Sequence, residues 1–253
     1  MSVLSFSKVR AGLAVVIAAL FCSAVSVRAD WSVDVEGGVA FGGYNDVRIP
    51  GNTGTDLSLT DDIESDEVGF FRFRVTAPLG QRHRLSVLVA PLRIEGSGTV
   101  DRDVDFNGVL FTSGQRVNSR YRFDSYRLTY SYTVVESDRL RLDLGFTAKV
   151  RDASIKLEGE NESSEKTNTG FVPLINFAID WSLTSKIGLL LEGDALAAPQ
   201  GRAEDVLAAA YTNITDRLRL RLGYRILEGG ADNDEVYTFA LVHYVSAGLT
   251  LMF

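Results

Sequence analysis

The chain has 253 residues, of which 45% are hydrophobic and 23% are charged, and its formal net charge is −7 at pH 7. This composition, with a mean hydropathy of +0.05, excludes an intrinsically disordered protein and a bundle of membrane-spanning helices. The acidic balance argues against a nucleic-acid partner, because phosphate backbones are bound by basic surfaces.

The N-terminal residues have the pattern of a secretory signal peptide. Lys8 and Arg10 precede an apolar run over residues 11–25, and small residues surround Ala29. We expect cleavage after Ala29, so that residues 1–29 are the signal and residues 30–253 form one domain. An uncleaved membrane anchor is the alternative. The one cysteine, Cys22, lies within this signal, so the mature chain is expected to lack disulfides and thiolate metal ligands.

From Asp30 onward the hydrophobic pattern has a period of two, with which side chains alternate between the faces of a β-strand. In residues 140–150 every even position is apolar and every odd position is polar, charged or glycine. In chain order, the pattern predicts ten strands at residues 31–44, 67–78, 83–95, 120–135, 139–151, 170–183, 186–195, 205–214, 217–227 and 236–253. Weak alternation in the alanine-rich segment 205–214 leaves eight strands as an alternative.

The predicted connections are of two alternating kinds. Short turns fall near residues 79–82, 136–138, 184–185 and 215–216, and long polar segments occupy residues 45–66, 96–119, 152–169, 196–204 and 228–235. A soluble β-sandwich has no reason to separate its loops in this way, whereas a membrane barrel has short periplasmic turns and longer external loops. The sequence therefore predicts an all-β fold, a ten-stranded antiparallel up-and-down transmembrane β-barrel.

The final residues, 245–253, alternate in polarity and end in the aromatic Phe253. With the signal and the alternating strands, they resemble Gram-negative outer-membrane β-barrel proteins, whose last strand is recognised by the barrel-assembly machinery. The resemblance implies that Phe253 is an assembly signal, and that the protein is an outer-membrane monomer in contact with outer-membrane lipid and lipopolysaccharide. Residues 193–205 and 223–237 are similar to uncharacterised proteobacterial members, and this similarity names no activity. We expect no cofactor.

The polar faces of the predicted strands carry charges of both signs. An Arg or Lys side chain that faces lipid at the bilayer midplane costs about 2–4 kcal/mol, so these faces are expected to line the lumen. The predicted lumenal charge network consists of Asp34, Glu36, Arg72, Arg74, Arg127, Arg141, Asp143, Asp180, Glu192, Asp194, Arg219, Arg221 and Arg225. A network that plugs the lumen predicts a structural or surface-interaction role, and a narrow charge-lined pore is the alternative.

A surface hydrolase acting on lipid or peptide is a further alternative, because ten strands is also the architecture of the omptin surface proteases. Such chemistry requires a base near the outer rim. His83 follows the first predicted periplasmic turn, however, and His243 lies between the apolar same-face neighbours Leu241 and Val245. We therefore expect no catalytic residue.

One acidic segment has partial calcium-loop spacing. Asp101, Asp103 and Asp105 are spaced as an EF-hand loop begins, but Phe106 replaces its turn glycine and Thr112 stands where the bidentate glutamate belongs. The segment is expected to be a solvated acidic loop without a metal ion.

Overall fold

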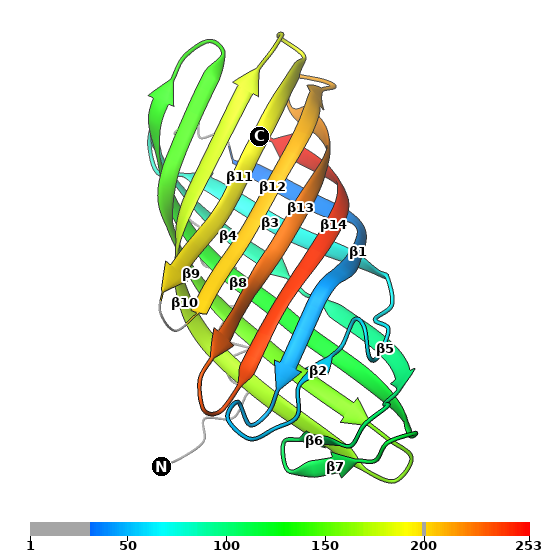
Figure 1. The fold of residues 1–253 in the computed structure, drawn as a ribbon. Helices are drawn as coiled ribbons and strands as arrows, with labels where there is room; N and C mark the ends of the chain where they lie inside the picture. Colours follow the sequence, from blue (N-terminus) through cyan, green and yellow to red (C-terminus); the bar gives the residue numbers. More distant parts are fainter. Residues whose placement is uncertain (1–30, 199–200) are drawn as a thin grey trace.

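The computed structural model describes residues 31–198 and 201–253, which form a closed antiparallel barrel of ten strands (Figure 1). The barrel strands are β1 (Ser32–Arg48), β3 (Val68–Pro78), β4 (His83–Ala90) with β5 (Arg93–Thr99), β8 (Arg116–Glu136), β9 (Leu140–Glu158), β10 (Ser163–Ser182), β11 (Ile187–Ala198), β12 (Gly201–Asn213), β13 (Leu218–Asp232) and β14 (Tyr237–Met252). Each strand pairs with its neighbours in sequence, and β14 pairs with β1 to close the barrel. The predicted fold class is confirmed, and the eight-strand alternative is wrong.

Two of the predicted strands, at residues 205–214 and 83–95, differ in how closely they match the structure. The alanine-rich segment is a full barrel strand, β12, which pairs with both β11 and β13. The predicted strand 83–95 is interrupted at Pro91, which has no N–H for the ladder, so β4 and β5 pair with successive parts of β8. The predicted signal peptide lies outside the described residues.

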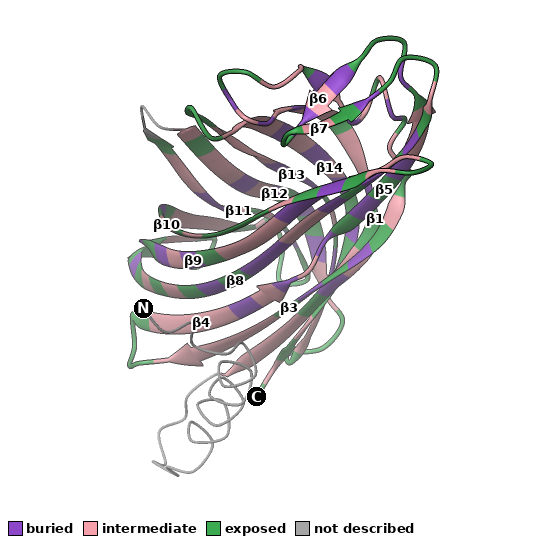
Figure 2. Cartoon of the chain, turned by 90° about the horizontal axis from the view of Figure 1, so that it is seen from below, coloured by how far each residue is buried: buried purple, intermediate pink, exposed green. Residues whose placement is uncertain are grey.

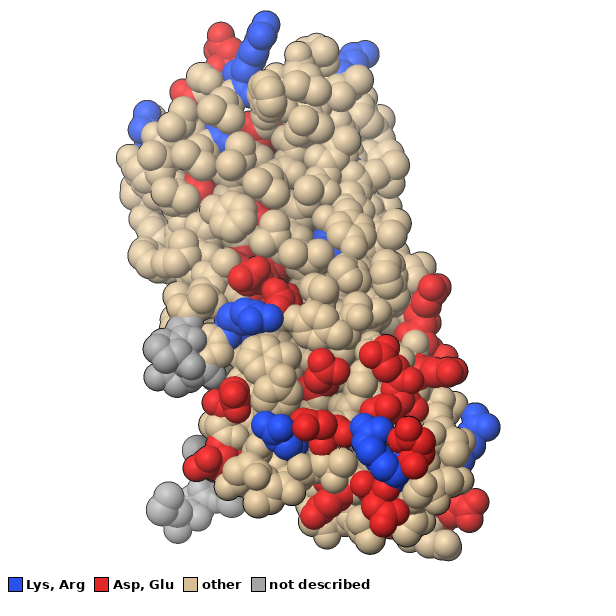
Figure 3. All heavy atoms as spheres, viewed as in Figure 1, with Lys and Arg blue, Asp and Glu red and all other residues tan. Residues whose placement is uncertain are grey.

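The outward face of the barrel is apolar. On β9, Phe146 is 67% exposed while its inward neighbours Thr147 and Lys149 are 2% and 3% exposed. Strand alternation places every second side chain outside, so the most exposed large apolar residues form the lipid-facing surface. Figure 3 shows this surface as an almost uncharged band, with charged residues gathered at the end that carries β6 and β7 in Figure 1. No helix in residues 31–198 and 201–253 has the length and hydropathy needed to cross a membrane.

Aromatic side chains mark the opposite end of the lipid-facing surface, near the short turns. Tyr130, Tyr132 and Trp181 are 40%, 37% and 51% exposed. The Tyr130 hydroxyl lies 2.6 Å from His83 Nδ1. Rings with one apolar and one polar edge favour the boundary between hydrocarbon and water, so these residues fit an interfacial girdle.

The connections at the other end differ from the prediction. Three of the five predicted long polar segments, 152–169, 196–204 and 228–235, are largely strand, since β9 pairs with β10 out to Glu158↔Ser163 and β13 pairs with β14 out to Asp232↔Tyr237. Their polarity is explained by position, because beyond the lipid-facing surface the outside of a strand meets water and the alternation disappears. Strands there still satisfy their backbone hydrogen bonds in the ladder.

The two remaining connections, residues 49–67 and 100–115, fold together as an outer cap that contains β2 (Leu57–Ser58), β6 (Val104–Phe106) and β7 (Val109–Phe111). The apolar side chains of the cap, of which Ile49, Leu59, Ile63 and Phe106 are at most 1% exposed, pack in one hydrophobic cluster with inward residues of the barrel strands. Backbone bonds such as Asn107 N–H to Ile49 C=O at 2.6 Å join its two segments. Figure 2, viewed from this end, shows β6 and β7 at one side of the mouth. The expectation of simple polar loops here is wrong.

Candidate functional site: the charged lumen

Buried ion pairs cross the middle of the lumen around Asp205. Asp205 Oδ2 accepts hydrogen bonds from Arg72 Nη2 at 2.9 Å and from Arg127 Nη2, and its Oδ1 accepts one from Arg225 Nη1 at 2.6 Å. Arg225 also donates from Nε and Nη2 to the two carboxylate oxygens of Glu36, each at 2.8 Å. We call Glu36, Arg72, Arg127, Asp205 and Arg225 the central cluster. Each of them is at most 4% exposed.

Asp194 extends the central cluster toward β9 and β10. It accepts a hydrogen bond from Arg127 Nη1 at 2.6 Å, one from the Thr147 hydroxyl at 2.6 Å and one from Asn176 Nδ2 at 2.8 Å. These donors come from β8, β9 and β10, so Asp194 on β11 is held by three successive strands. Both carboxylate oxygens of Asp194 therefore accept hydrogen bonds from side chains of the barrel wall, which fix the orientation of the carboxylate.

Gly248 makes room for an arginine that crosses over a neighbouring strand. Gly248 on β14 lies between Glu36 on β1 and Arg221 on β13 in the strand register. A Cβ atom at Gly248 would lie 2.5 Å from Arg221 Cζ, so the missing side chain lets this guanidinium cross over β14. Arg221 thereby reaches Glu36 Oε2 at 3.0 Å and Asp34 Oδ1 at 2.8 Å.

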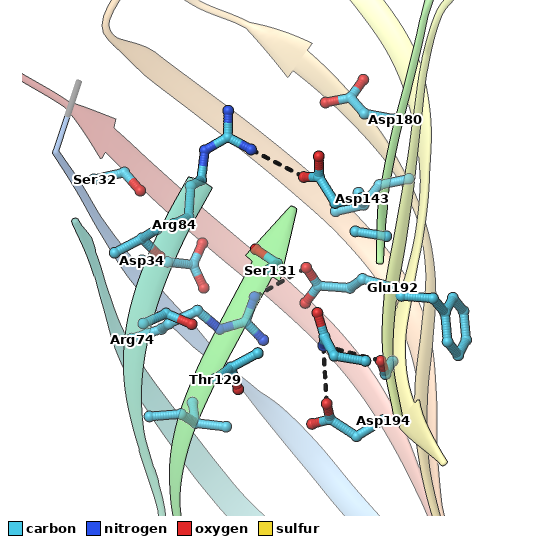
Figure 4. A pocket seen from close by; sticks show the side chains of 18 of the residues that line it. Ser32, Asp34, Arg74, Arg84, Thr129, Ser131, Asp143, Asp180, Glu192 and Asp194 are labelled. Carbon is cyan, nitrogen blue, oxygen red and sulfur yellow. Dashed lines mark hydrogen bonds and ion pairs between the residues drawn. The ribbon is translucent and has the colours of Figure 1, made fainter. Parts of the chain in front are cut away.

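Further ion pairs line a cavity of about 240 Å³ on the short-turn side of the central cluster, the inner cavity. Arg74 Nη1 contacts Glu192 Oε2 at 2.9 Å, and Arg84 Nη1 contacts Asp143 Oδ2 at 3.0 Å. Figure 4 shows these two arginines reaching across the cavity from β3 and β4 to carboxylates on other strands. The inner cavity is therefore lined by groups that already have partners.

The remaining predicted charges lie nearest the short turns. Arg141 Nε donates to Asp143 Oδ1 at 3.0 Å. Arg219 Nη1 donates to Asp180 Oδ2 at 2.6 Å and its guanidinium carbon lies 3.7 Å from the centre of the Tyr211 ring. All the residues predicted for the lumenal network thus point inward, and each pairs with an oppositely charged residue.

Sequence reasoning missed the acceptor at the centre of the cluster. The inward residues of β12 include Asp205, Leu207, Ala209 and Tyr211, while Val206, Ala208 and Ala210 point outward. Both faces are mainly apolar, so the alternation that identified the other lumenal charges is absent. A single carboxylate in an otherwise apolar barrel strand was the available signal. Arg84 was also missed, because it lies next to a predicted turn.

Phe253 lies at the seam where the barrel closes. Its backbone N–H donates to Trp31 C=O at 2.9 Å, and its side chain is 60% exposed. The ring therefore points away from the lumen, beside the last pairs between β1 and β14. A terminal aromatic at this position fits the interfacial girdle, and its role as an assembly signal stays a prediction.

The two histidines lie on the outside of the barrel. His243 Nδ1 is 2.6 Å from the Tyr224 hydroxyl, and its ring packs against Phe41 with 5.4 Å between centroids. Its same-face neighbour Val245 is 58% exposed. Neither His83 nor His243 lines the inner cavity.

The acidic side chains at positions 101, 103 and 105 of the cap each contact a different partner. Asp103 Oδ1 accepts the Ser113 N–H at 2.8 Å, Asp105 Oδ1 accepts the Gly108 N–H at 3.1 Å, and Asp101 pairs with Arg102 at 2.9 Å. These bonds stabilise the turns of the β6–β7 hairpin. Within the described part of the chain, no three His, Cys, Asp or Glu side chains gather in a metal-binding arrangement.

No protein-family model and no curated protein matches the sequence. Among solved structures, the chain is similar to the outer membrane protease OmpT of Escherichia coli at 9% identity, with 88% of this chain and 97% of that chain covered and a TM-score of 0.54. It also matches Ail of Yersinia pestis at 10% identity, 88% and 98% coverage and a TM-score of 0.36. Neisserial surface protein A matches at 13% identity, 90% and 100% coverage and a TM-score of 0.34.

At 9% identity, the match to OmpT bears on the fold alone and carries no activity over to this chain. The fold itself combines a closed ten-stranded barrel, an apolar outward face and a charged interior. That arrangement places the apolar face in lipid and the charges away from it, as a membrane-spanning barrel requires. The chain therefore has the fold of an outer-membrane β-barrel protein such as OmpT, a closed ten-stranded antiparallel barrel with an apolar outward face.

Proposed function

We propose that this protein is a barrel whose lumen is closed by ion pairs and whose role is structural or surface-interacting. The observation that carries the proposal is the pairing of side chains from distant parts of the wall. Arg127 on β8 contacts Asp205 on β12, with β9, β10 and β11 between them in the sheet. Arg72 on β3 contacts the same carboxylate, with β1, β14 and β13 between.

The central cluster resists opening because its members hold one another. A guanidinium presents its donors in a planar fork, and Arg225 uses that fork on both Glu36 and Asp205. Moving Arg225 aside would break its ion pairs with Glu36 and Asp205 together, and breaking one truly buried pair costs about 3–5 kcal/mol. A wall of such pairs is a poor path for hydrated ions.

The outer cap supports the surface-interaction part of the proposal. Its apolar core holds two chain segments in one arrangement, so that the charged side chains on its surface keep fixed positions. Figure 3 shows charges of both signs gathered at this end of the molecule. A preorganised, charged surface favours specific contact with another molecule because less conformational entropy is lost on binding.

Single-channel recording in planar bilayers tests the closed lumen. We expect no steady open state from the unmodified protein, and intermittent conductance from Asp205→Asn, which weakens the central cluster without changing side-chain size. Asp216→Asn, in the exposed turn before β13, is the matched control and should stay silent. A stable, ion-selective conductance from the unmodified protein, altered by Asp205→Asn, would establish the narrow pore instead.

A further inference from the structure

A second cavity, of about 150 Å³, lies on the cap side of the central cluster and shares no lining residue with the inner cavity. We call it the outer cavity. Lys149 and Arg151 of β9 line it, and Ile49 of the cap and Val236 before β14 lie at its outer end. Along the inward face of β9, Asp143 therefore belongs to the inner cavity, Thr147 contacts Asp194, and Lys149 begins the outer cavity.

Lys149 has no anionic partner. It is 3% exposed, and among the described residues no hydrogen bond or ion pair to its ammonium group is formed. Its Nζ lies 4.8 Å from the centre of the Phe123 ring, which also lines the outer cavity. The carboxylate oxygens of Asp205 are already used by three arginines. A buried ammonium without a counter-charge is unfavourable, so this position is suited to an anion from outside the chain.

Arg151 is a second cation with unused donors in the same cavity. Its one hydrogen bond within the described chain is from Nη2 to Asn168 Oδ1, and its buried Nε has no partner. Gly170 lies opposite Arg151 in the register, and a Cβ atom there would be 3.2 Å from Arg151 Nη2. The glycine therefore leaves space for the guanidinium. Residues 149 and 151 share a strand face, about 7 Å apart, so one carboxylate can contact both.

Apart from Lys166 of β10 and the Arg202–Glu228 ion pair, the rest of the outer cavity is mainly apolar. Tyr121 and Phe123 of β8 face Leu227 of β13 and Val242 of β14 across it. Tyr121, Leu227 and Val242 are buried. An anion that carries only charge would leave these walls without a partner, and an apolar molecule would leave the two cations without one.

We propose that the outer cavity binds a small organic anion made of one carboxylate and a short apolar group. The carboxylate lies between Lys149 and Arg151, and the apolar group packs against Phe123 and Leu227. This inference goes beyond the proposed function and does not depend on it, because binding in the outer cavity requires no opening of the central cluster.

Isothermal titration of the purified barrel in a non-ionic detergent tests the site, with 3-phenylpropionate as the probe. Acetate supplies the charge without the apolar group, and 3-phenyl-1-propanol supplies the apolar group without the charge. We expect saturable binding of 3-phenylpropionate alone. Lys149→Gln and Arg151→Gln should each weaken it about tenfold, the loss expected for one charge-assisted hydrogen bond. Lys186→Gln, in the exposed turn before β11, is the matched control and should bind as the unmodified protein does.

Heat-modifiable electrophoretic mobility shows that each variant is a folded barrel, and Arg151→Lys should bind more tightly than Arg151→Gln because it keeps the charge. The proposal is overturned if the unmodified protein binds 3-phenylpropionate no better than the alcohol or acetate. It is equally overturned if folded Lys149→Gln retains full affinity. Neither result affects the conductance test of the closed lumen, because that test depends on the central cluster and not on the outer cavity.

Discussion

The inner and outer parts of the lumen are filled by different physical means. In the central cluster and around the inner cavity, arginines and carboxylates pair across the barrel, as Arg225 does with Glu36 and Asp205. In the outer cap, Ile49, Leu59 and Phe106 pack in a hydrophobic cluster that continues into the outer ends of the barrel strands. Between these regions lies the outer cavity, where Lys149 and Arg151 pair with no carboxylate among the described residues. Each charge that lines the inner cavity already has a partner of opposite charge, which is why the proposed anion site lies in the outer part.

This contrast follows from where each region lies relative to the membrane. Inside the membrane-spanning wall, outward positions must be apolar, and inward positions are left to fill the lumen with polar groups that pair with one another. Beyond the lipid, the outside of the sheet is polar, as the Arg122 Nη2–Asp152 Oδ1 pair at 2.9 Å shows. The apolar side chains are then free to face inward and hold the cap.

Cysteine labelling of intact cells should give the largest difference between the two ends. Cysteines introduced at Asn52 and Glu162 should react with a membrane-impermeant reagent, and one at Asp138 should not, because the short turns face the periplasm. The predicted mature chain has no cysteine of its own, so the background is low. Labelling of position 138 alone would reverse the assigned orientation.

The inner part should be the more sensitive to loss of one charge. Asp205→Asn leaves three arginines with a weaker acceptor, and we expect a loss of about 3–5 kcal/mol in the free energy of unfolding if the site stays dry. Denaturant titration of the folded barrel measures this loss. Glu204→Gln, one residue away on the outward face of β12, is the control and should change stability little. Equal losses from both variants would contradict a buried cluster centred on Asp205.

The outer cap should respond to loss of volume. Phe106→Ala removes a side chain that is 1% exposed. Replacing a fully buried Phe by Ala lowers the free energy of unfolding by about 3–5 kcal/mol. Because the cap lies outside the barrel wall, we expect rapid proteolysis of residues 100–115 while heat-modifiable mobility is retained. Leu110→Ala, at a side chain that is 55% exposed, should leave the cap resistant. Loss of the whole barrel in Phe106→Ala would show that the two regions fold as one unit.

The smallest effect concerns pH and the Arg102–Asp62 pair, which joins the two cap segments at 2.9 Å. Partial burial raises the pKa of Asp62, but hydrogen bonds from Arg102 and from the Ser58 N–H outweigh it, so the pKa lies below its ordinary value of 3.8. A lowered folded pKa means that the stabilisation is present above the ordinary value and is lost as pH falls through the folded one. Protease resistance of the cap should therefore decline modestly below about pH 4.

Two variants isolate that pH effect. Asp62→Asn should remove most of the decline, because its amide does not titrate, and Asp61→Asn, in an exposed neighbouring position, should keep it. An unchanged pH profile in Asp62→Asn would assign the decline to other carboxylates of the cap.

The alternation in residues such as 140–150 was enough to predict the strands, their inward faces and a charged lumen, because a period of two is a local property that burial on one side imposes on each strand separately. The same reasoning failed in residues 152–169 and 228–235, where the outward face of the strand is polar and only a few inward side chains, such as Ile155 and Leu157, are apolar and buried. It also failed for the cap, whose apolar residues are scattered over two segments.

The pairing of each lumenal arginine with its carboxylate was decided only by closure of the barrel. Asp205 accepts from arginines on β3, β8 and β13, and the first two of these strands are far from β12 in sequence. Arg221 reaches Asp34 only because Gly248 leaves a gap on the strand between them. Lys149 belongs to the same alternating pattern as the paired charges, yet it has no carboxylate. Periodicity in sequence places a side chain on a face, whereas its partner depends on the curvature and register of the whole sheet.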